Sequence, residues 1–336
     1  MRYKEFLNYK LSEIGIGTYL GNTDEETDNN YYETIKLGIY KGINVIDTAI
    51  NYRGMKSERV IGKILNEIDR NKVVISTKGG YITPPPEAKE PARWFKEEML
   101  GKGIISPDDI TQTGNVITAR YIDWVFETSL KNLSTDYIDV YFLHNPEDQL
   151  LNFDKDNFYK KLKVVFRLLE GKVKEGKLKY YGLATWSGFR VSLDNRQYLS
   201  LKDIYDMAME VGGENHHFRF IQLPYNMAMP EAYFLKNQLL DGEYVSTFEA
   251  CQKLGIYTYT SASIMQTRIL GKIPEEVAKL LRVNSQVLAA IQFVRSTPGV
   301  GTALIGMSKK QHLEENLKIE DITPVDKSII DSLIKY

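Results

Sequence analysis

Four side chains of types that move protons lie at or just past the ends of separate apolar runs. Asp47 and Tyr52 follow the run 43–46, Lys78 ends KVVISTK, and His144 ends YIDVYFLH. Apolar runs of this length that alternate with helical patterns are typical of parallel strands. In an α/β barrel the C-terminal ends of the strands meet at one face, which carries the chemistry. The spacing therefore predicts that the four side chains converge on one pocket.

Together these residue types can deliver a proton to a carbonyl oxygen. Hydride addition to a carbonyl puts negative charge on the oxygen, so a nearby acid and a positive field lower the barrier. Tyr52 is the expected acid in reduction and the base in oxidation. A tyrosine has a pKa of about 10, and a neighbouring ammonium such as Lys78 favours its phenolate. Asp47 would pair with Lys78 and make its burial tolerable, while His144 would donate a hydrogen bond to the carbonyl oxygen.

Each of the four also has a purely structural interpretation. Asp47 would then cap a turn, Tyr52 would be one packing tyrosine among 22, Lys78 would end a strand, and His144 would be a satisfied loop residue. Their joint position at successive strand ends favours the catalytic interpretation.

The chain pattern contains about eight strand–helix units. The expected strands are 11–17, 43–48, 72–77, 138–143, 179–184, 220–223, 256–260 and 301–305, and the expected helices are 31–41, 57–68, 121–133, 158–174, 201–211, 247–254, 284–295 and 309–317. Strict alternation favours a parallel sheet with helices outside it, and eight right-handed crossovers close a (β/α)8 TIM barrel. We expect one domain over residues 1–336; a doubly wound open sheet is the alternative.

One segment, 79–118, interrupts this alternation after the third strand. Loops of this length inside a compact domain are usually functional or disordered. Because it follows the strand that ends at Lys78, we predict a lid over the active face, anchored by burial of Trp94 and Phe95. The alternative is a surface insertion without contact to substrate.

The composition limits the classes of partner. The 336 residues carry a formal net charge of −1, so nothing indicates nucleic acid or an anionic membrane surface. No apolar stretch is long enough to span a bilayer, and the lone Cys251 excludes an intramolecular disulfide. His216 and His217 have no third ligand nearby, so no metal site is predicted. A cytoplasmic protein is the simplest expectation; the oligomeric state stays open.

The motifs GIGTY, GINVIDTAINYRGMKSERVIGKIL, ISTKGG, YIDVYFLHNP, YYGLATW, IQLPYN and IGMSKKQHLEENL together resemble the aldo-keto reductase superfamily over nearly the whole chain. GLATW and TSAS, with the long insertion, resemble a divergent and mostly microbial branch of it. The resemblance implies an eight-stranded barrel whose N-terminal end is plugged by a short hairpin, for which residues 1–10 are available. It assigns Asp47, Tyr52, Lys78 and His144 the roles given above.

The resemblance also implies a nicotinamide dinucleotide, bound without a glycine-rich Rossmann turn; no G-x-G-x-x-G follows a strand here. Gly306 to Ser308 directly precede an expected helix, whose N-terminus offers N–H groups to a phosphate, with Ser308 as a candidate cap. The implied cofactor residues are Thr18, Asp47, Thr185, Gln222, Ser261, Arg268, Gly306, Ser308, His312, Glu315 and Asn316.

Three positions depart from the family pattern. Ala184-Thr185 stands where Ser-Asn is usual, Ser261 replaces the tyrosine that stacks on the nicotinamide, and His312 aligns with the usual arginine at the 2′-phosphate. Trp186 is a candidate for the missing ring. Because Lys309 and Lys310 remain beside His312, we favour NADP(H), with NAD(H) as the alternative.

The substrate expected from the resemblance is a small carbonyl compound: an aldehyde, a ketone or a sugar-like molecule. Tyr19, Trp94 and Trp186 are the expected substrate contacts. Two other functions remain open. One is a cofactor-binding regulatory subunit with slow turnover, like the β subunits of potassium channels; the other is a metal-dependent hydrolase or lyase that uses Asp47 and His144.

Overall fold

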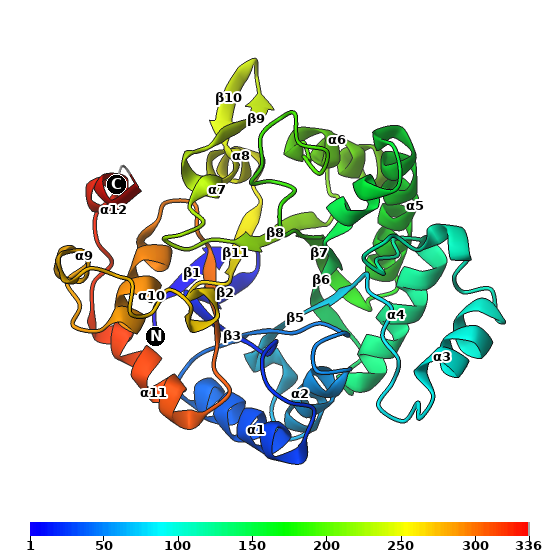
Figure 1. Ribbon diagram of the computed structural model, residues 1–336, viewed down its shortest axis with the longest axis horizontal. Helices are drawn as coiled ribbons and strands as arrows, with labels where there is room; N and C mark the ends of the chain where they lie inside the picture. Colours follow the sequence, from blue (N-terminus) through cyan, green and yellow to red (C-terminus); the bar gives the residue numbers. More distant parts are fainter. Residues whose placement is uncertain (335–336) are drawn as a thin grey trace.

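Eight parallel strands close into a barrel in the computed structural model, which describes residues 1–334 (Figure 1). Each strand pairs with the next in the order β3, β4, β5, β6, β7, β8, β11 and β12, and β12 returns to β3. The strands are β3 (Ile14–Gly17), β4 (Val45–Asp47), β5 (Val74–Gly79), β6 (Ile138–His144), β7 (Leu178–Ala184), β8 (Phe218–Pro224), β11 (Tyr257–Ser261) and β12 (Thr302–Gly306). The TIM barrel prediction is confirmed, and the open sheet is excluded.

Helices surround the barrel (Figure 1). They are α1 (Glu25–Tyr40), α2 (Lys56–Leu65), α4 (Ala119–Asn132), α5 (Lys155–Lys174), α6 (Leu201–Gly212), α8 (Thr247–Leu254), α10 (Gln286–Ser296) and α11 (Lys310–Leu317), with the shorter α3 (Pro91–Trp94), α7 (Glu231–Phe234), α9 (Glu275–Leu280) and α12 (Lys327–Ile334). Side-chain caps determine the residue at which several of these helices begin. Asp24, Thr118, Asp154, Ser200 and Ser246 each accept a backbone N–H bond as the N-cap of the following helix.

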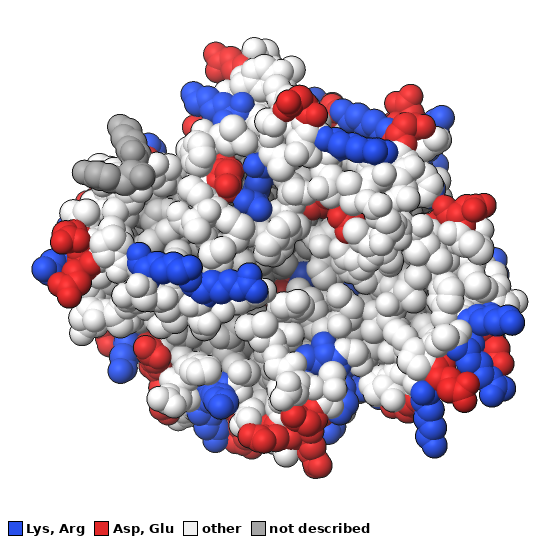
Figure 2. Space-filling model, in the orientation of Figure 1, with Lys and Arg blue, Asp and Glu red and all other residues white. Residues whose placement is uncertain are grey.

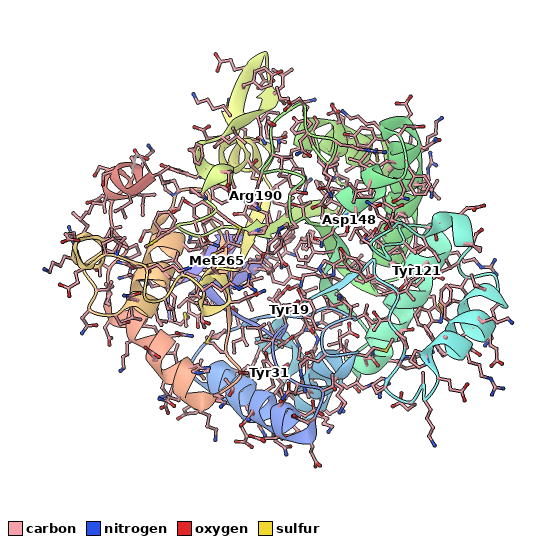
Figure 3. All side chains as sticks on the ribbon, in the orientation of Figure 1. Tyr19, Tyr31, Tyr121, Asp148, Arg190 and Met265 are labelled. Atoms are coloured by element: carbon pink, nitrogen blue, oxygen red, sulfur yellow. The ribbon has the colours of Figure 1, made fainter. Side chains whose placement is uncertain are left out.

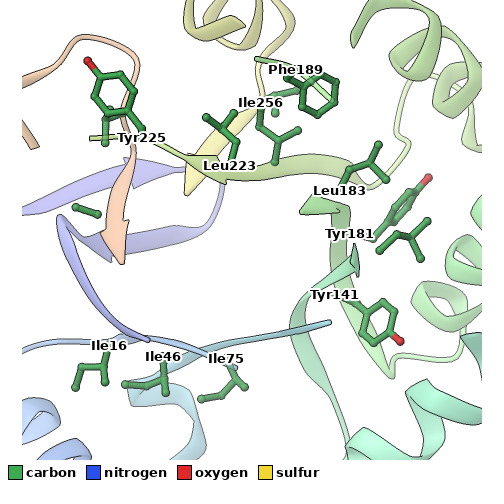
Figure 4. Packing of buried hydrophobic residues seen from close by; sticks show 14 of the residues in the cluster. Ile16, Ile46, Ile75, Tyr141, Tyr181, Leu183, Phe189, Leu223, Tyr225 and Ile256 are labelled. Atoms are coloured by element: carbon green, nitrogen blue, oxygen red, sulfur yellow. The ribbon is translucent and has the colours of Figure 1, made fainter. Parts of the chain in front are cut away.

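Apolar side chains fill two layers, one inside the barrel and one between the strands and the helices. Ile16, Ile46 and Ile75 lie level with one another on β3, β4 and β5 and belong to the outer layer (Figure 4). Val45, Phe142 and other side chains fill the interior. Strands buried on both faces explain why the strand segments read as continuous apolar runs rather than as alternating patterns.

An antiparallel hairpin, β1 (Tyr3–Phe6) and β2 (Tyr9–Ser12), covers the N-terminal end of the barrel. Phe6 and Tyr9 pack against the apolar cluster inside the barrel, so the hairpin is the expected plug. Its second strand runs beyond residue 10, and the expected strand 11–17 is divided at Glu13 between β2 and β3. The Ser12 hydroxyl donates to the Ile14 carbonyl at 2.7 Å, which stabilises this break.

A second hairpin, β9 (Lys236–Leu240) and β10 (Glu243–Ser246), projects from the rim of the molecule (top of Figure 1). The sequence analysis missed it. Asp241 and Gly242 form its turn with φ values of 51° and 83°. An Asp-Gly pair between apolar residues is a strong hairpin signal, because this turn needs positive φ at both positions.

Most of the segment 79–118 lies beside α4, at the periphery of the molecule (Figure 1). It contains α3 and the π-helical turn η2 (Phe95–Leu100). The Trp94 ring lies 6.0 Å from the ring of Trp124 on α4, measured between centroids. Trp94 and Phe95 are partly buried against the outer apolar cluster, as expected of anchors, and Trp94 packs on the outside of the barrel. Closure of the segment over the barrel mouth as a lid stays a prediction.

Among residues 1–334, none of the helices combines the length and the apolar character that crossing a bilayer requires.

Candidate active site

A cavity of about 490 Å³ opens at the C-terminal ends of the barrel strands. Figure 2 shows the corresponding hollow near the centre of this face, and Figure 3 places Tyr19 beside it. The predicted site residues that line it are Thr18, Tyr19, Asp47, Tyr52, His144, Thr185, Trp186, Gln222, Ser261, Gly306, Ser308 and His312. They come from seven of the eight barrel strands or the loops that follow them, which explains how residues far apart in sequence share one site.

A buried ion pair forms the floor of the site. The Lys78 Nζ donates to Asp47 Oδ2 at 2.6 Å and to the Thr48 carbonyl at 2.7 Å, and its side chain is inaccessible to solvent. The other carboxylate oxygen, Asp47 Oδ1, accepts from Ser76 at 2.7 Å and from Gln222 at 2.9 Å. Both charges therefore have close partners, which is the condition under which a protein interior tolerates an ion pair.

Tyr52 lies directly above this pair. The Lys78 Nζ is 4.6 Å from the centroid of the Tyr52 ring, which is 9% exposed. The tight turn between Tyr52 and α2 runs through Arg53, Gly54 and Met55, all with positive φ. Such backbone is uncommon for residues other than glycine, and here it directs the Tyr52 ring back over the strand ends.

The electrostatics of Tyr52 differ from the expectation. Burial, and then the charge of Asp47, raise the pKa of the Tyr52 phenol well above its ordinary value. The expected lowering of this pKa by Lys78 is not found, because burial and the charge of Asp47 both act in the opposite direction. A raised pKa keeps the phenol protonated at neutral pH, and this is the form that an acid needs in reduction.

Lys78 and His144 are also shifted by their surroundings. Burial lowers the pKa of Lys78, while the charges of Asp47 and Glu58 oppose that change. Burial, with a smaller contribution from Lys78, lowers the pKa of His144 to about 3. His144 is therefore a neutral imidazole at physiological pH, able to donate one hydrogen bond. Its ring meets the Tyr52 ring edge-on at 5.9 Å between centroids.

Another part of the cavity wall carries the polar side chains of Thr185 and Gln222, which could hydrogen-bond a carboxamide group. The Thr185 hydroxyl oxygen is buried, and within residues 1–334 it has no hydrogen-bond partner. The Gln222 amide lines the same cavity. A buried polar atom without a partner costs free energy, so Thr185 favours a ligand that hydrogen-bonds there.

Five predicted residues do not line this cavity. Lys78 is buried beneath it, where it contacts Asp47. Trp94 lies against α4, as described above. Arg268 directly follows Thr267, which does line it. Glu315 and Asn316 lie on α11, one turn beyond His312. That helix begins at Lys310 with Lys309 as its N-cap residue and no side-chain cap, so the prediction that Ser308 caps it is wrong.

Three wall residues were not predicted from the sequence. Tyr81, Asn145 and Asn51 line the cavity. Tyr81 meets the His144 ring edge-on at 5.1 Å, and its hydroxyl accepts from Asn145 Nδ2 at 2.9 Å. The signal was available: Tyr81 and Asn145 both follow barrel strands within two residues.

In the described part of the chain, no group of three or more His, Cys, Asp or Glu side chains is placed to hold a metal ion. His216 and His217 instead contact Arg219 and Glu170 respectively.

Comparisons with known proteins identify the family of this chain. The model of the Aldo/keto reductase family matches residues 13–335. A protein of Schizosaccharomyces pombe named "Putative voltage-gated potassium channel subunit beta" is 25% identical over 97% of this chain and 91% of its own length. The aldo-keto reductase YhdN of Bacillus subtilis is 34% identical, over 41% of this chain and 35% of its own length.

Solved structures show the same fold. An aldo-keto reductase of Bacillus halodurans in its holo form has a TM-score of 0.68 and 20% identity, covering 99% of this chain and 96% of its own. An aldo-keto reductase of Klebsiella pneumoniae in complex with NADPH has a TM-score of 0.64 and 19% identity, covering 97% and 91%.

Proposed function

This chain belongs to the aldo/keto reductase family, and from that premise we propose that it reduces an aldehyde or ketone with NADPH, or oxidises the corresponding alcohol with NADP⁺. The observation that carries the proposal is the buried Lys78–Asp47 pair beneath a protonated Tyr52. A hydrolase or lyase would have little use for a phenol held in this way above a buried cation.

Each residue of the site has a distinct role in carbonyl reduction. Tyr52 donates its phenolic proton to the carbonyl oxygen as negative charge develops there. Neutral His144 donates a hydrogen bond to the same oxygen and orients the substrate. Lys78 supplies a positive field from below, and Asp47 holds it in place. When bound, the dinucleotide supplies the hydride that adds to the carbonyl carbon. Preorganised donors of this kind each contribute roughly 10²-fold to 10³-fold in rate.

The cavity fits a nicotinamide dinucleotide. Thr185 and Gln222 would hold the carboxamide, since the Thr185 hydroxyl is buried without a partner and both residues line the cavity. Gly306 and Ser308 precede α11 and would meet the pyrophosphate and adenosine end. Lys309 and His312 would meet a 2′-phosphate. Lys310 is paired with Glu33 at 3.0 Å and is less available for that contact.

The walls around Tyr52 suit an uncharged carbonyl compound. Tyr19, Tyr81 and Trp186 present aromatic surface, and Asn51 and Asn145 present amides. Among the described residues that line the cavity there is no lysine or arginine. A carboxylate on the substrate would lack a cationic partner here, so we propose a neutral aldehyde, ketone or sugar-like molecule.

A second candidate is a cofactor-binding subunit with slow turnover. It is favoured by the Schizosaccharomyces pombe relative, which covers nearly the whole chain. Both candidates predict dinucleotide binding, and they differ in the turnover rate.

We expect NADPH to quench tryptophan fluorescence saturably and more tightly than NADH does. Trp186 lines the cavity, whereas Trp94 and Trp124 contact each other away from it. The Trp94→Phe/Trp124→Phe variant therefore isolates the reporting residue. Titration with each cofactor, followed by steady-state turnover of benzaldehyde, tests the function. Binding with rapid turnover supports a reductase, and binding with turnover far below roughly 1 s⁻¹ supports the subunit. Absence of binding to either cofactor in calorimetry would refute both.

The His312→Ala/Lys309→Ala variant should weaken NADPH binding about 100-fold, because two contacts to the 2′-phosphate are lost, and leave NADH binding nearly unchanged. Each hydrogen bond to a charged group is worth about 1.5 kcal/mol or more, and 1.4 kcal/mol corresponds to a factor of ten. Lys318→Ala removes an exposed lysine at the far end of α11 and serves as the control. Equal losses for both cofactors would place the 2′-phosphate elsewhere.

A further inference from the structure

Two acidic residues directly after the catalytic strand connect two loops of the site. Glu147 and Asp148 lie in the 3₁₀ turn η4 (Pro146–Leu151), which follows His144 and Asn145. Glu147 is fully buried, and Asp148 is partly buried. Figure 3 shows Asp148 at the rim of the barrel mouth, between Tyr19 and the helices. Neither acid lines the cavity, so whatever they contribute to the reaction acts through their neighbours.

Glu147 holds the loop that follows β7. Its Oε1 accepts the backbone N–H groups of Trp186 at 2.6 Å, Ser187 at 2.9 Å and Gly188 at 3.3 Å. Successive N–H groups that converge in this way form an anion-binding nest. Here a carboxylate of the same chain fills the nest. Burial raises the pKa of Glu147 to about 7, and the backbone hydrogen bonds oppose that rise.

The same loop is held from its other side. The Arg190 Nε donates to the Trp186 carbonyl at 3.0 Å, and Arg190 is itself paired with Glu231 at 2.6 Å. The backbone of Trp186 is thus fixed at both its N–H and its carbonyl. Its indole nevertheless remains 50% exposed at the cavity wall. The contacts of Glu147 and Arg190 therefore set the point from which the indole projects.

Asp148 holds the opposite wall. Its Oδ2 accepts the Tyr81 hydroxyl at 2.8 Å and the Thr113 hydroxyl at 2.9 Å, so it contacts both ends of the segment 79–118. Its Oδ1 accepts from Gln197, in the loop after β7, at 3.1 Å. Tyr81 is in turn the ring that meets His144 edge-on.

We propose that Glu147 and Asp148 are positioning residues that set the separation of the two aromatic walls, Trp186 and Tyr81, and thereby determine which carbonyl substrates fit beside His144. The proposal rests on the function proposed above. An aromatic wall binds a substrate well only when it is preorganised, so loosening either wall weakens the binding of substrates that contact it. Thr185 is held separately, because its N–H bonds to the Gln222 carbonyl of β8 at 2.8 Å. The contact that Thr185 would make with the carboxamide should therefore be independent of Glu147.

The test compares a substrate that reaches the walls with one too small to do so. We expect Glu147→Leu to raise the KM for benzaldehyde about tenfold, with kcat, the KM for propanal and the Kd for NADPH each changed less than about threefold. Glu147→Gln keeps an acceptor oxygen for the three N–H groups and should restore the preference for benzaldehyde. Assays at about pH 8 keep Glu147 ionised in the wild-type protein.

Asp148→Ala and Tyr81→Phe provide a second route if Glu147→Leu does not fold. Tyr81→Phe keeps the ring and removes only its tether, so it should lower the ratio of kcat/KM for benzaldehyde to that for propanal, as Asp148→Ala does. Glu170→Leu is the matched control: Glu170 is also a buried acid that accepts from a tyrosine and a backbone N–H, but it lies outside the cavity.

The outcomes separate the two proposals. Wild-type protein that turns over neither aldehyde would refute the proposed function. Active wild-type protein whose substrate preference is unchanged in Glu147→Leu, Asp148→Ala and Tyr81→Phe would refute the positioning role alone. An equal loss in Glu170→Leu would show that the effect reports general stability, and would also refute it.

Discussion

Tyr52→Phe is expected to lose about 10²-fold to 10⁴-fold in kcat for carbonyl reduction while its Kd for NADPH stays close to that of the wild type. The substitution removes one oxygen atom and the only proton that Tyr52 can donate. The ring keeps its position between Tyr19, at 5.0 Å, and His144, at 5.9 Å. Packing is therefore retained while the acid is lost. Steady-state kinetics, with cofactor binding measured by fluorescence, will separate the two properties.

Tyr225→Phe is the matched control for that experiment. Tyr225 is a buried tyrosine whose hydroxyl hydrogen-bonds the Thr297 side chain at 3.0 Å, and it packs on Phe293 away from the cavity. Its loss should change stability slightly and kcat hardly at all. If Tyr52→Phe kept wild-type kcat, the acid would have to be another group, and the assignment of Tyr52 would be wrong.

The sequence was sufficient to predict the barrel and the positions of the four central residues. Asp47, Lys78 and His144 lie at the ends of strands and Tyr52 follows one, and these strands are recognisable because a parallel barrel strand is buried on both faces and rich in apolar residues. Strand ends meet at one face by topology, so identifying the strands was enough to bring these residues together. Their contacts then follow from charge: a lysine with no solvent access needs the partner that Asp47 provides.

Features that depend on tertiary contacts were not predictable in the same way. A tryptophan in a long insertion is compatible with a lid. The position of Trp94 nevertheless depends on whether Trp124 of α4 or the barrel mouth offers it the larger apolar contact surface. The pKa of Tyr52 depends on the balance between burial, Asp47 and Lys78, which requires distances. The strand-end positions of Tyr81 and Asn145 can be read from the sequence, whereas the bonds from the Tyr81 hydroxyl to Asp148 and from Asn145 to Tyr81, which hold the ring beside His144, depend on the fold.

The last prediction separates the catalytic role of Lys78 from its structural role. Lys78→Met should reduce kcat by about 10²-fold or more, since it removes the cation beneath Tyr52. It should also destabilise the fold by about 3 kcal/mol, because Asp47 is left as a buried charge without a cation. Asp47 keeps its bonds from Ser76 and Gln222, which places the loss at the lower end of the usual range.

Two further variants distinguish loss of the Lys78 cation from loss of fold stability. In Asp47→Asn/Lys78→Met the unpaired charge is also removed, so stability to chemical denaturation should recover in part while kcat stays low. Arg295→Met breaks another buried ion pair, with Glu13, far from the cavity, and should lose comparable stability while its folded fraction keeps wild-type kcat. Recovery of kcat in the double variant would contradict the catalytic role, because it would mean that Lys78 serves only to neutralise Asp47.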